Sequence, residues 1–547
     1  MAALDPPVAL RTLTIFEYVS RLGYQGAEQQ LRFLDPKLSG LTNPSGMKDR
    51  GLAAERIAQA VQAGQRIVVF GDYDCDGMTA TAILSEVLGE LGASVVPLLA
   101  SRFDGGYGVS ERALRRIVEQ KPHLVVTCDC GSSDHLTLRQ LTEAGIDVIV
   151  IDHHLVPDEP LPVLAFLNPH RPDCSFPYKG LASCGLALSI AAELRKQLGV
   201  DLDMRRWLDL VAIGTIADVA PLSGDNRILV RAGLQKLKEA QRPGLRALMD
   251  LIGIDRSFPL TAADIGFRIA PRLNAPGRLQ APDRAFELLV ERDPLKADQV
   301  AHDVEHLCQK RRVEQATILA EAEIDLAALV RNSGEPIVVG REGWNHGIVG
   351  IVAGRLADQY QAPTVVIGFE GGVGRGSVRG PAGFPLFDAI AESSELLQRF
   401  GGHQAAAGLE IAWGHLPAFR AAFSQACAKR KDYQAPPSAP ALAVHPGDRM
   451  SDILSDLYLL EPTGEGNAAV SLALSCHVKT CRQVRGGHVK LEMELDSGEK
   501  VGGFGPGLAE QLAEFTGRAT VIGQLRPDTY RGGGAVELLV KSVTATH

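Results

Sequence analysis

The sequence predicts an α/β protein of several domains: a parallel-sheet domain, a long helix, a smaller α/β domain and a β-barrel. Three observations support this prediction. From about 67 to 218, short β-branched runs alternate with helical stretches, as in a buried parallel sheet. A second alternation of this kind begins near 336. Beyond 441, short alternating segments are separated by glycine turns, as in a small barrel.

Each element of the first domain follows from its local pattern. The domain begins with apolar, β-branched runs of strand length. These predict strands at Ile67–Phe70, Val95–Leu99, Leu124–Thr127 and Asp147–Ile151. Helical patterns cover Thr79–Leu91 and Trp207–Thr215. Strands alternating with helices in this way predict a parallel sheet.

A long helical pattern with few breakers, rich in Ala, Glu, Leu and Arg, covers about 285–330. Within it, His302 and His306 are four residues apart, a spacing that can bind a metal. Their neighbours are strongly charged, Arg311 among them. We therefore expect this part of the helix to be a solvated face.

The second α/β unit and the barrel are predicted in the same way. Strands are expected at Pro336–Val339 and Thr364–Ile367, with a helix near Ile348–Tyr360 between them. The proline-rich stretch Tyr433–Pro440 is typical of a linker. Barrel strands are then expected at His488–Leu495, Ala519–Leu525 and Ala535–Val540.

These patterns divide the 547 residues into five parts, in keeping with about 100–200 residues per domain. The first part is an N-terminal extension, which we expect to pack on the first sheet. The parts are the extension (1–60), the parallel-sheet domain (61–225), a helical connector (226–332), the smaller α/β domain (333–432) and the barrel (441–547).

Composition and charge argue against several classes of protein. Lys and Arg number 56 and Asp and Glu 65, and this net charge of −9 does not suit a protein coated in positive charge. No apolar run approaches the ~18 residues of a membrane helix, and no signal-peptide pattern is evident. The nine cysteines include no C-x-x-C pair, which argues against structural zinc and a disulfide framework. We therefore expect a cytoplasmic protein.

Acidic residues and histidines follow the predicted elements directly. They are Asp72, Asp74, Asp76, Asp129, Asp152, His153, His154 and Asp218. A single aspartate after a strand usually caps a helix or forms an Asx turn. Here four separate elements repeat the feature, and the carboxyl ends of parallel strands meet at one edge of a sheet. We therefore expect these side chains to form one site.

Such a cluster indicates bound cations. Massed carboxylates repel one another unless a cation neutralises them. Oxygen ligands with imidazole as the one type of nitrogen ligand suit Mn²⁺ or Mg²⁺ better than Zn²⁺, and we expect Mn²⁺ rather than Mg²⁺. Five or six ligands favour two ions, the usual arrangement for in-line displacement at phosphorus.

Four motifs resemble those of the DHH phosphoesterase superfamily. They are Asp72-Tyr-Asp-Cys-Asp-Gly77, Asp129 within Thr-Cys-Asp-Cys-Gly, Asp152-His-His154, and Asp218 within Gly-Thr-Ile-Ala-Asp-Val-Ala-Pro-Leu. The aspartate-led first motif is similar to that of the single-stranded-DNA exonucleases of the superfamily. The similarity continues through Arg272–Arg278, Gly374–Arg379, Gly401–Gly408 and Glu461–Asn467. The resemblance implies a DHH catalytic domain, a DHH-associated domain and an oligonucleotide-binding (OB) barrel.

The resemblance also implies a role for each residue of the cluster. One ion would be held by Asp74 and Asp129, with Asp72 close by. The other would be held by Asp76, Asp129, His153 and Asp218. His154 would face the scissile phosphate and would complete the catalytic set.

Glycine-rich loops carry the candidate substrate-binding residues. Guanidinium groups beside flexible backbone suit phosphate. By resemblance the loops at Gly374–Gly380 and Gly401–His403 belong to the DHH-associated domain, which closes over the metal face, and Arg278 would hold phosphate at the 5′ end. The residues are Arg102, Tyr107, Arg278, Ser377, Arg379 and His403. Two positions depart from the family pattern: Gly105 separates Asp104 from Gly-Tyr-Gly, and one residue separates His346 from Trp344, which leaves open whether His346 contacts substrate.

The predicted barrel carries a candidate track for a DNA strand. Between Asn467 and Leu491 there is no acidic residue. The basic residues in this stretch are Lys479, Arg482, Arg485 and Lys490. Such barrels bind single strands through cations and stacked aromatic rings. Phe504 and Tyr530 are the aromatic candidates, although an aromatic residue in a small barrel more often belongs to the core.

The leading interpretation is a metal-dependent 5′→3′ exonuclease that hydrolyses single-stranded DNA to mononucleotides in DNA repair and recombination. The 5′ polarity rests on the resemblance. One alternative is a phosphodiesterase for nanoRNA or cyclic dinucleotides, which would need no extended track on a barrel. Another is a non-catalytic DNA-binding scaffold, against which the intact ligand set argues. The expected partners are single-stranded DNA, a single-strand-binding protein and a helicase, with the chain a monomer.

Overall fold

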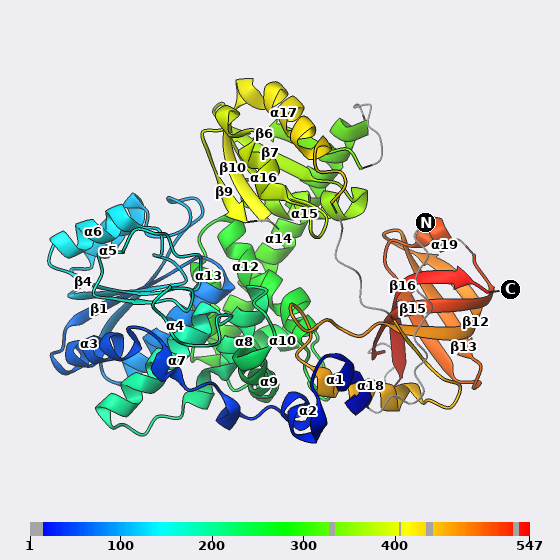
Figure 1. Cartoon of the computed structure of the whole chain (residues 1–547), viewed down its shortest axis with the longest axis horizontal. Helices are drawn as coiled ribbons and strands as arrows, with labels where there is room; N and C mark the ends of the chain where they lie inside the picture. Colours follow the sequence, from blue (N-terminus) through cyan, green and yellow to red (C-terminus); the bar gives the residue numbers. More distant parts are fainter. Residues whose placement is uncertain are drawn as a thin grey trace.

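The computed structural model describes residues 15–327, 334–403, 406–433, 441–512, 514–528 and 535–546. Figure 1 shows a first α/β domain in blue and cyan, a second one above it in yellow-green, and a barrel in orange and red to the side. Helices drawn in green lie between them. The predicted architecture is confirmed: a parallel-sheet domain, a helical connection, a smaller α/β domain and a barrel.

The first domain is built on a five-stranded parallel sheet with the order β2-β1-β3-β4-β5. The strands are β1 (Arg66–Gly71), β2 (Ser94–Leu99), β3 (Leu124–Cys128), β4 (Asp147–Ile151) and β5 (Ala165–Leu167). Alternate residues of β1 enter separate cores: Ile67 and Val69 on one face, Val68 and Phe70 on the other. The sheet is therefore covered on both faces, as its continuous apolar strands predict.

Helices on the two faces fill those cores. The helices on the Ile67 side are α3 (Arg50–Gln62), α4 (Cys75–Glu90), α7 (Ser183–Leu198) and α8 (Leu208–Ala217). Those on the Val68 side are α5 (Glu111–Glu119) and α6 (His135–Glu143). The amino end of α4 and the carboxyl end of α8 both lie at the edge of the sheet where β1 and β3 end, which positions the site described below.

Further helices join the two α/β domains. They are α9 (Gly224–Glu239), α10 (Pro243–Leu251), α11 (Ala262–Asp264), α12 (Ala270–Leu279), α13 (Asp283–Val290) and α14 (Pro294–Ala327). The continuous helical pattern predicted over 285–330 is two helices that meet at 291–293. A proline lacks the N–H that a helix interior needs, so α14 starts at Pro294, and Asp293 caps it by accepting a hydrogen bond from the N–H of Leu295 (2.8 Å). None of the described helices is long and apolar enough to cross a membrane.

The second α/β domain has a mixed sheet of order β6-β7-β8-β10-β9. Its strands are β6 (Ile337–Glu342), β7 (Thr364–Glu370), β8 (Val373–Arg379), β9 (Arg399–His403) and β10 (Ala406–Ala412). Its helices are α15 (Val349–Tyr360), α16 (Leu386–Ala391) and α17 (Leu416–Ala428). The predicted linker Tyr433–Pro440 lies, apart from Tyr433, outside the described residues.

The barrel closes because β12 pairs with both β13 and β15. Its strands are β12 (Leu472–Val484), β13 (His488–Leu495), β14 (Lys500–Gly505), β15 (Gly517–Pro527) and β16 (Val536–Ala545). The short strand β11 (Leu442–Ala443) and the helices α18 (Met450–Leu460) and α19 (Ala509–Leu512) accompany it. The predicted barrel strands are therefore confirmed.

The N-terminal helices correct one prediction. We expected residues 1–60 to pack on the first sheet, and within them α3 does so. In contrast, α1 (Ile15–Arg21) and α2 (Gly26–Leu34) pack on the barrel side of the molecule. Val19, Phe33 and Leu34 are buried with Met450 of α18, because this apolar cluster is their available partner.

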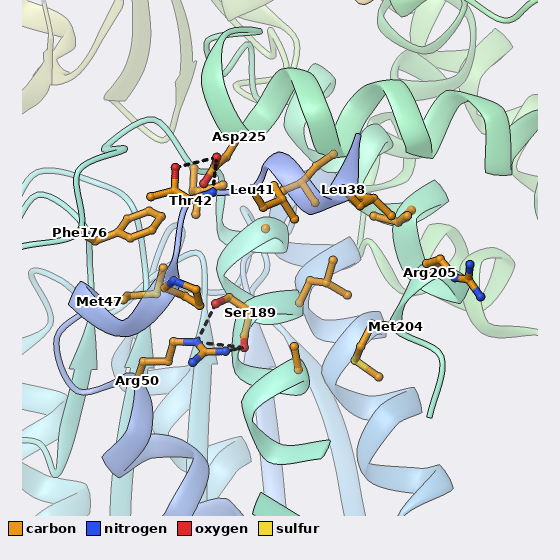
Figure 2. Close-up of a pocket in the computed structure, with 17 residues that line it drawn as sticks. Leu38, Leu41, Thr42, Met47, Arg50, Phe176, Ser189, Met204, Arg205 and Asp225 are labelled. Atoms are coloured by element: carbon orange, nitrogen blue, oxygen red, sulfur yellow. Dashed lines mark hydrogen bonds between the residues drawn. The ribbon is translucent and has the colours of Figure 1, made fainter. Parts of the chain in front are cut away.

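Residues 38–50 run along α7 and enclose a largely apolar cavity of about 220 Å³ (Figure 2). Polar contacts fasten this segment at both ends. The backbone N–H and the hydroxyl of Thr42 donate to Asp225 Oδ1 (3.0 and 2.9 Å). Nε of Arg50 donates to Ser189 Oγ (2.8 Å). The segment therefore ties α3 to α7 and α9.

Arg227 of α9 connects three parts of the chain. Its guanidinium is buried and lies 3.8 Å from the centre of the Phe33 ring. Its nitrogens donate to the carbonyl oxygens of Phe33 in α2 and of Leu460 and Pro462 after α18 (2.9–3.3 Å). One cation thus fixes the barrel and the N-terminal helices to the first domain.

We predict that Arg227→Ala lowers the stability of the protein by about 3 kcal/mol, because it leaves several buried carbonyl groups without donors. Arg205→Ala is the matched control, since Arg205 pairs with Asp203 on the surface, where an ion pair contributes little to stability. Urea unfolding followed by circular dichroism measures both. Equal midpoints for the two variants would contradict this prediction.

Candidate metal centre

The turn from β1 into α4 places three aspartates at the sheet edge. Asp74 caps α4, and its Oδ1 accepts hydrogen bonds from the N–H groups of Asp76 (3.0 Å) and Gly77 (3.1 Å). A Cβ on Gly77 would lie 2.6 Å from the backbone of Asp72, so the turn needs glycine at this position. The capping interpretation is therefore correct for Asp74, and its second carboxylate oxygen is left for another partner.

The amino end of α7 orients two of the carboxylates. The N–H groups of Ser183 and Cys184 donate to the two oxygens of Asp76 (2.7 and 2.9 Å). The hydroxyl of Ser183 donates to Asp129 Oδ1 (3.0 Å). A helix amino end stabilises negative charge. Ser183 was not among the predicted site residues; the run of small residues Ala182–Gly185 at a helix start is the sequence signal for it.

One imidazole lies among three carboxylates. His153 Nε2 lies 3.3 Å from Asp129 Oδ1, 3.6 Å from Asp218 Oδ2 and 3.9 Å from Asp76 Oδ2. This nitrogen is buried and has no hydrogen-bond partner, and the same is true of Asp72 Oδ1. Buried polar atoms without partners are uncommon and need an explanation. A bound cation would satisfy both atoms.

Three overlapping donor groups emerge from this geometry: Asp72, Asp74 and Asp129; Asp76, His153 and Asp218; and Asp129, His153 and His154. The first two share no residue and form the paired donor sets. Within each set the ligand atoms lie within 4.8 Å of one another. Carboxylate oxygens with one imidazole nitrogen suit Mn²⁺ or Mg²⁺. The residues therefore fit two divalent cations.

In the absence of a cation, burial and mutual repulsion disfavour ionisation of Asp72, Asp129 and Asp218. Burial, followed by the neighbouring carboxylates, holds the pKa of Asp72 and of Asp129 well above the ordinary value. The same causes raise the pKa of Asp218 to about 8. Divalent cations would remove this repulsion, so the charge of the site, like its geometry, suits bound cations.

Asp152 supports the site from behind. It is fully buried and accepts hydrogen bonds from the N–H groups of Ser132 (3.1 Å) and His153 (2.8 Å) and from His154 Nδ1 (2.8 Å). Burial, the largest single effect, opposes its ionisation, but the hydrogen bonds from His154 and Ser132, with the charge of His154, together outweigh burial and lower the pKa of Asp152 to about 2. Burial lowers the pKa of His154 while Asp152 raises it, with a net result of about 9.

Basic side chains lie across from the acids. The guanidinium of Arg102 lies 4.5 Å from the centre of the Tyr73 ring, and its buried Nε has no hydrogen-bond partner. The hydroxyl of Tyr107 donates to the carbonyl oxygen of Asp129 (3.2 Å) and contacts His154 Nδ1 (3.0 Å). Two predicted substrate-binding residues thus lie at the metal centre.

The connecting helix α12 and the second α/β domain contribute the remaining predicted residues. Arg379 Nη1 donates to Ser377 Oγ (2.9 Å), and Arg278 Nη1 donates to the carbonyl oxygen of Gly347 (3.1 Å). The ring of His346 lies 4.8 Å from that of Phe103, so this residue reaches the loop that carries Arg102. His403 ends β9, and its side chain lies outside the described residues.

The structure shows where the residues of the predicted track on the barrel lie. Arg482, Lys490 and Phe504 are opposite one another on adjacent strands and share one face. Phe504 is half-buried on that face rather than in the core. Lys479 pairs with Glu494 (3.4 Å). Tyr530 lies outside the described residues.

Comparison with known proteins assigns the class of fold and site. Residues 66–215 match the model of the DHH family, N-terminal domain, and residues 334–429 match the DHHA1 domain. The paired acidic donor sets lie within the first of these matches, apart from Asp218 just beyond its end. The chain is therefore a member of the DHH family.

Individual relatives narrow the assignment. The chain is 32% identical over 533 residues to the single-stranded-DNA-specific exonuclease RecJ of Bacillus subtilis, covering 96% of this chain and 67% of the relative. Its structure resembles that of RecJ with Mn²⁺ from Thermus thermophilus, with a TM-score of 0.81, 30% identity and coverage of 97% and 76%. A Mg²⁺ complex from the same organism gives a TM-score of 0.76 at 27% identity, covering 97% and 74%. The chain belongs to the RecJ family.

We predict that the metal-free protein loses stability as pH rises from about 4 to 8. The raised pKa values of Asp129 and Asp218 mean that the folded protein retains protons that the unfolded chain releases, so rising pH favours unfolding. Mn²⁺ displaces those protons and should therefore raise the melting temperature most near the upper end of this range.

Melting curves across this pH range, with and without Mn²⁺, measure the effect. Asp218→Asn removes one titrating ligand and should flatten the pH dependence of the Mn²⁺ shift. A shift that is the same at every pH would show that these acids do not titrate as described.

Proposed function

We propose that this chain is a metal-dependent 5′→3′ exonuclease that hydrolyses single-stranded DNA to mononucleotides in DNA repair and recombination. The observation that carries the proposal is the pair of donor sets with a group of arginines beside them, since the charge of Arg102 acts both on Asp72 and on Arg278. The similarity to single-stranded-DNA-specific exonucleases supports the substrate. The 5′ polarity rests on the family resemblance and is part of the proposal.

The ligand assignment proposed here follows the donor sets. Asp74 and Asp129 would hold one ion with Asp72 beside them, and Asp76, Asp129, His153 and Asp218 would hold the other. The chemistry that two such ions would supply is activation of the attacking water and neutralisation of the charge that develops on the phosphate. The chain's own part is to aim the ligands: Ser183 fixes Asp129 and Asp76. We favour Mn²⁺ over Mg²⁺ because of the imidazole ligand.

His154 has a distinct part in this proposal. Its Nδ1 is engaged by Asp152, so Nε2 is the nitrogen left to donate to a phosphate oxygen. Its pKa of about 9 keeps the ring protonated at neutral pH. A cationic donor stabilises the charge of the phosphate in the transition state.

The proposed substrate-binding residues come from three parts of the chain. We propose that Arg102, Tyr107 and Arg278 hold phosphate from the first domain and the connector. Ser377, Arg379 and His403 hold it from the second domain. Buried guanidiniums without carboxylate partners suit phosphate, which accepts two parallel hydrogen bonds from one fork.

The remaining assignments are proposals of the same kind. We retain the domain limits 1–60, 61–225, 226–332, 333–432 and 441–547. The partners proposed beside single-stranded DNA are a single-strand-binding protein and a helicase, and we expect a cytoplasmic monomer. Size-exclusion chromatography with light scattering tests the oligomeric state.

A substrate panel tests the proposal and its alternatives. The protein with Mn²⁺ is given 5′-labelled single strands, 5′-labelled duplexes and dinucleotides. Mononucleotide release from the 5′ end of long single strands is the expected result. Cleavage of dinucleotides alone would indicate a small-substrate phosphodiesterase, and binding without cleavage would indicate a scaffold.

We predict that Asp129→Asn lowers the cleavage rate at least about a thousandfold, because Asp129 contributes to both ions in the proposed assignment. Asp147→Asn is the matched control: Asp147 begins β4 at the opposite end of the sheet and pairs with Arg56. Rates on 5′-labelled single strands, with circular dichroism as a check of folding, measure the difference. Near-normal activity of a folded Asp129→Asn protein would refute the metal assignment.

A further inference from the structure

Arg311 on α14 is buried, although the sequence predicts a solvated face there. About 8% of its surface is exposed, whereas His302 and His306 on the same helix are exposed as predicted. The difference arises because α14 packs on α12 at this level, where Cys308 Sγ contacts the carbonyl oxygen of Pro271 (3.9 Å). A buried guanidinium is costly unless an opposite charge accompanies it.

The protein supplies no such charge among the residues that the structure describes. Arg311 Nη1 donates to the neutral Oε1 of Gln315 (2.9 Å), and Nη2 has a long contact with Cys308 Sγ (4.0 Å). Its Nε is buried without a hydrogen-bond partner. Arg311 therefore has an uncompensated charge and a free donor.

Arg311 lines a pocket of about 500 Å³ between α14 and α15. Arg312 and Arg355 also line it, and both are exposed, with no ion pair in the described part of the chain. The acidic residue of the lining is Glu323, whose Oε1 accepts a hydrogen bond from Gln359 (3.3 Å). Three guanidiniums against one carboxylate make the pocket positive, and its volume suits a small ligand.

Arg311 in this pocket also lies close to the arginines beside the metal centre. Burial, and then the positive charges of Arg102, Arg311 and Arg379, lower the pKa of Arg278 to about 10. Arg311 is thus within electrostatic reach of the groups that face the metal centre. Cations gathered in this way repel one another until an anion binds between them.

We propose that this pocket is a second phosphate-binding site, to which Arg311 contributes its unpaired charge from α14 and Arg355 contributes from α15. The ligand is a phosphate group, either in the backbone of a bound single strand or on a free nucleoside monophosphate. The phosphate site stands without the proposed nuclease function; only the strand as its source rests on that function.

The experiment uses the full chain, free of metal in EDTA, so that no cleavage occurs. The variants are Arg311→Gln, Arg311→Lys and Arg355→Gln, with Lys310→Gln as control. Lys310 is the preceding residue, is exposed, and does not line the pocket, so its substitution removes the same charge nearby. Binding of a 3′-labelled oligo(dT) is measured by anisotropy over a salt series. The melting temperature is measured with inorganic phosphate and with dAMP.

The salt slope is the slope of log K for oligo(dT) binding against log salt concentration. If the ligand is a backbone phosphate, Arg311→Gln should weaken oligo(dT) binding about tenfold and reduce this slope by about 0.7, the value of one phosphate contact on a single strand. Arg311→Lys should restore most of the slope. If the ligand is a free nucleotide, the slope stays unchanged and the stabilisation by phosphate and dAMP is lost instead.

Two outcomes overturn the proposal. One is an Arg311→Gln protein that matches Lys310→Gln in both measurements. The other applies if Arg311→Gln does not fold: Arg355→Gln, at an exposed position, must then show the same kind of loss, and an unchanged Arg355→Gln refutes the site. Absence of cleavage by the wild type with Mn²⁺ would count against the proposed function alone.

Discussion

The enclosure of several carboxylates at one edge of the first sheet is the constraint on which the rest of the structure depends. Asp72, Asp76 and Asp129 are almost completely buried, and for Asp72 and Asp129 repulsion adds to the cost of burial. The fold reduces that cost with the amino end of α7 and the Ser183 hydroxyl. The remaining repulsion favours bound cations. The parallel sheet places their ligands together, because β1, β3, β4 and α8 all end near one point.

The side chains of Arg102, Arg278 and Arg379, close to this site, carry positive charge. Burial, and then the positive charges of Arg102, Arg311 and Arg379, lower the pKa of Arg278. Arg102, Arg278 and Arg379 have no carboxylate in an ion pair among the described residues. This arrangement suits a phosphodiester because its negative charge is attracted both by the guanidiniums and by bound cations. The net charge of −9 is therefore compatible with a nucleic-acid substrate, because the positive charges that attract phosphate are gathered near the metal centre.

Sequence reasoning reached the strands and the acids after them because both depend on local pattern: β-branched runs make strands, and parallel strands end at one edge. It did not reach what depends on packing between distant segments. Ser183 is an ordinary serine until α7 points it at Asp129. Arg311 has the neighbours of a surface residue, yet α12 covers it. The break at Pro294 was readable in principle, since proline marks a helix start.

The packing of α1 and α2 on the barrel side has a consequence for synthesis of the chain. Val19 and Phe33 are made first, whereas their partner Met450 follows more than 400 residues later. At about 5–20 residues per second, a ribosome takes roughly 20–80 s to reach that partner. During this interval the first domain can fold while the apolar face of α1 and α2 stays uncovered. The helices α1 and α2 and the cluster around Met450 therefore cover each other only after most of the chain has been made.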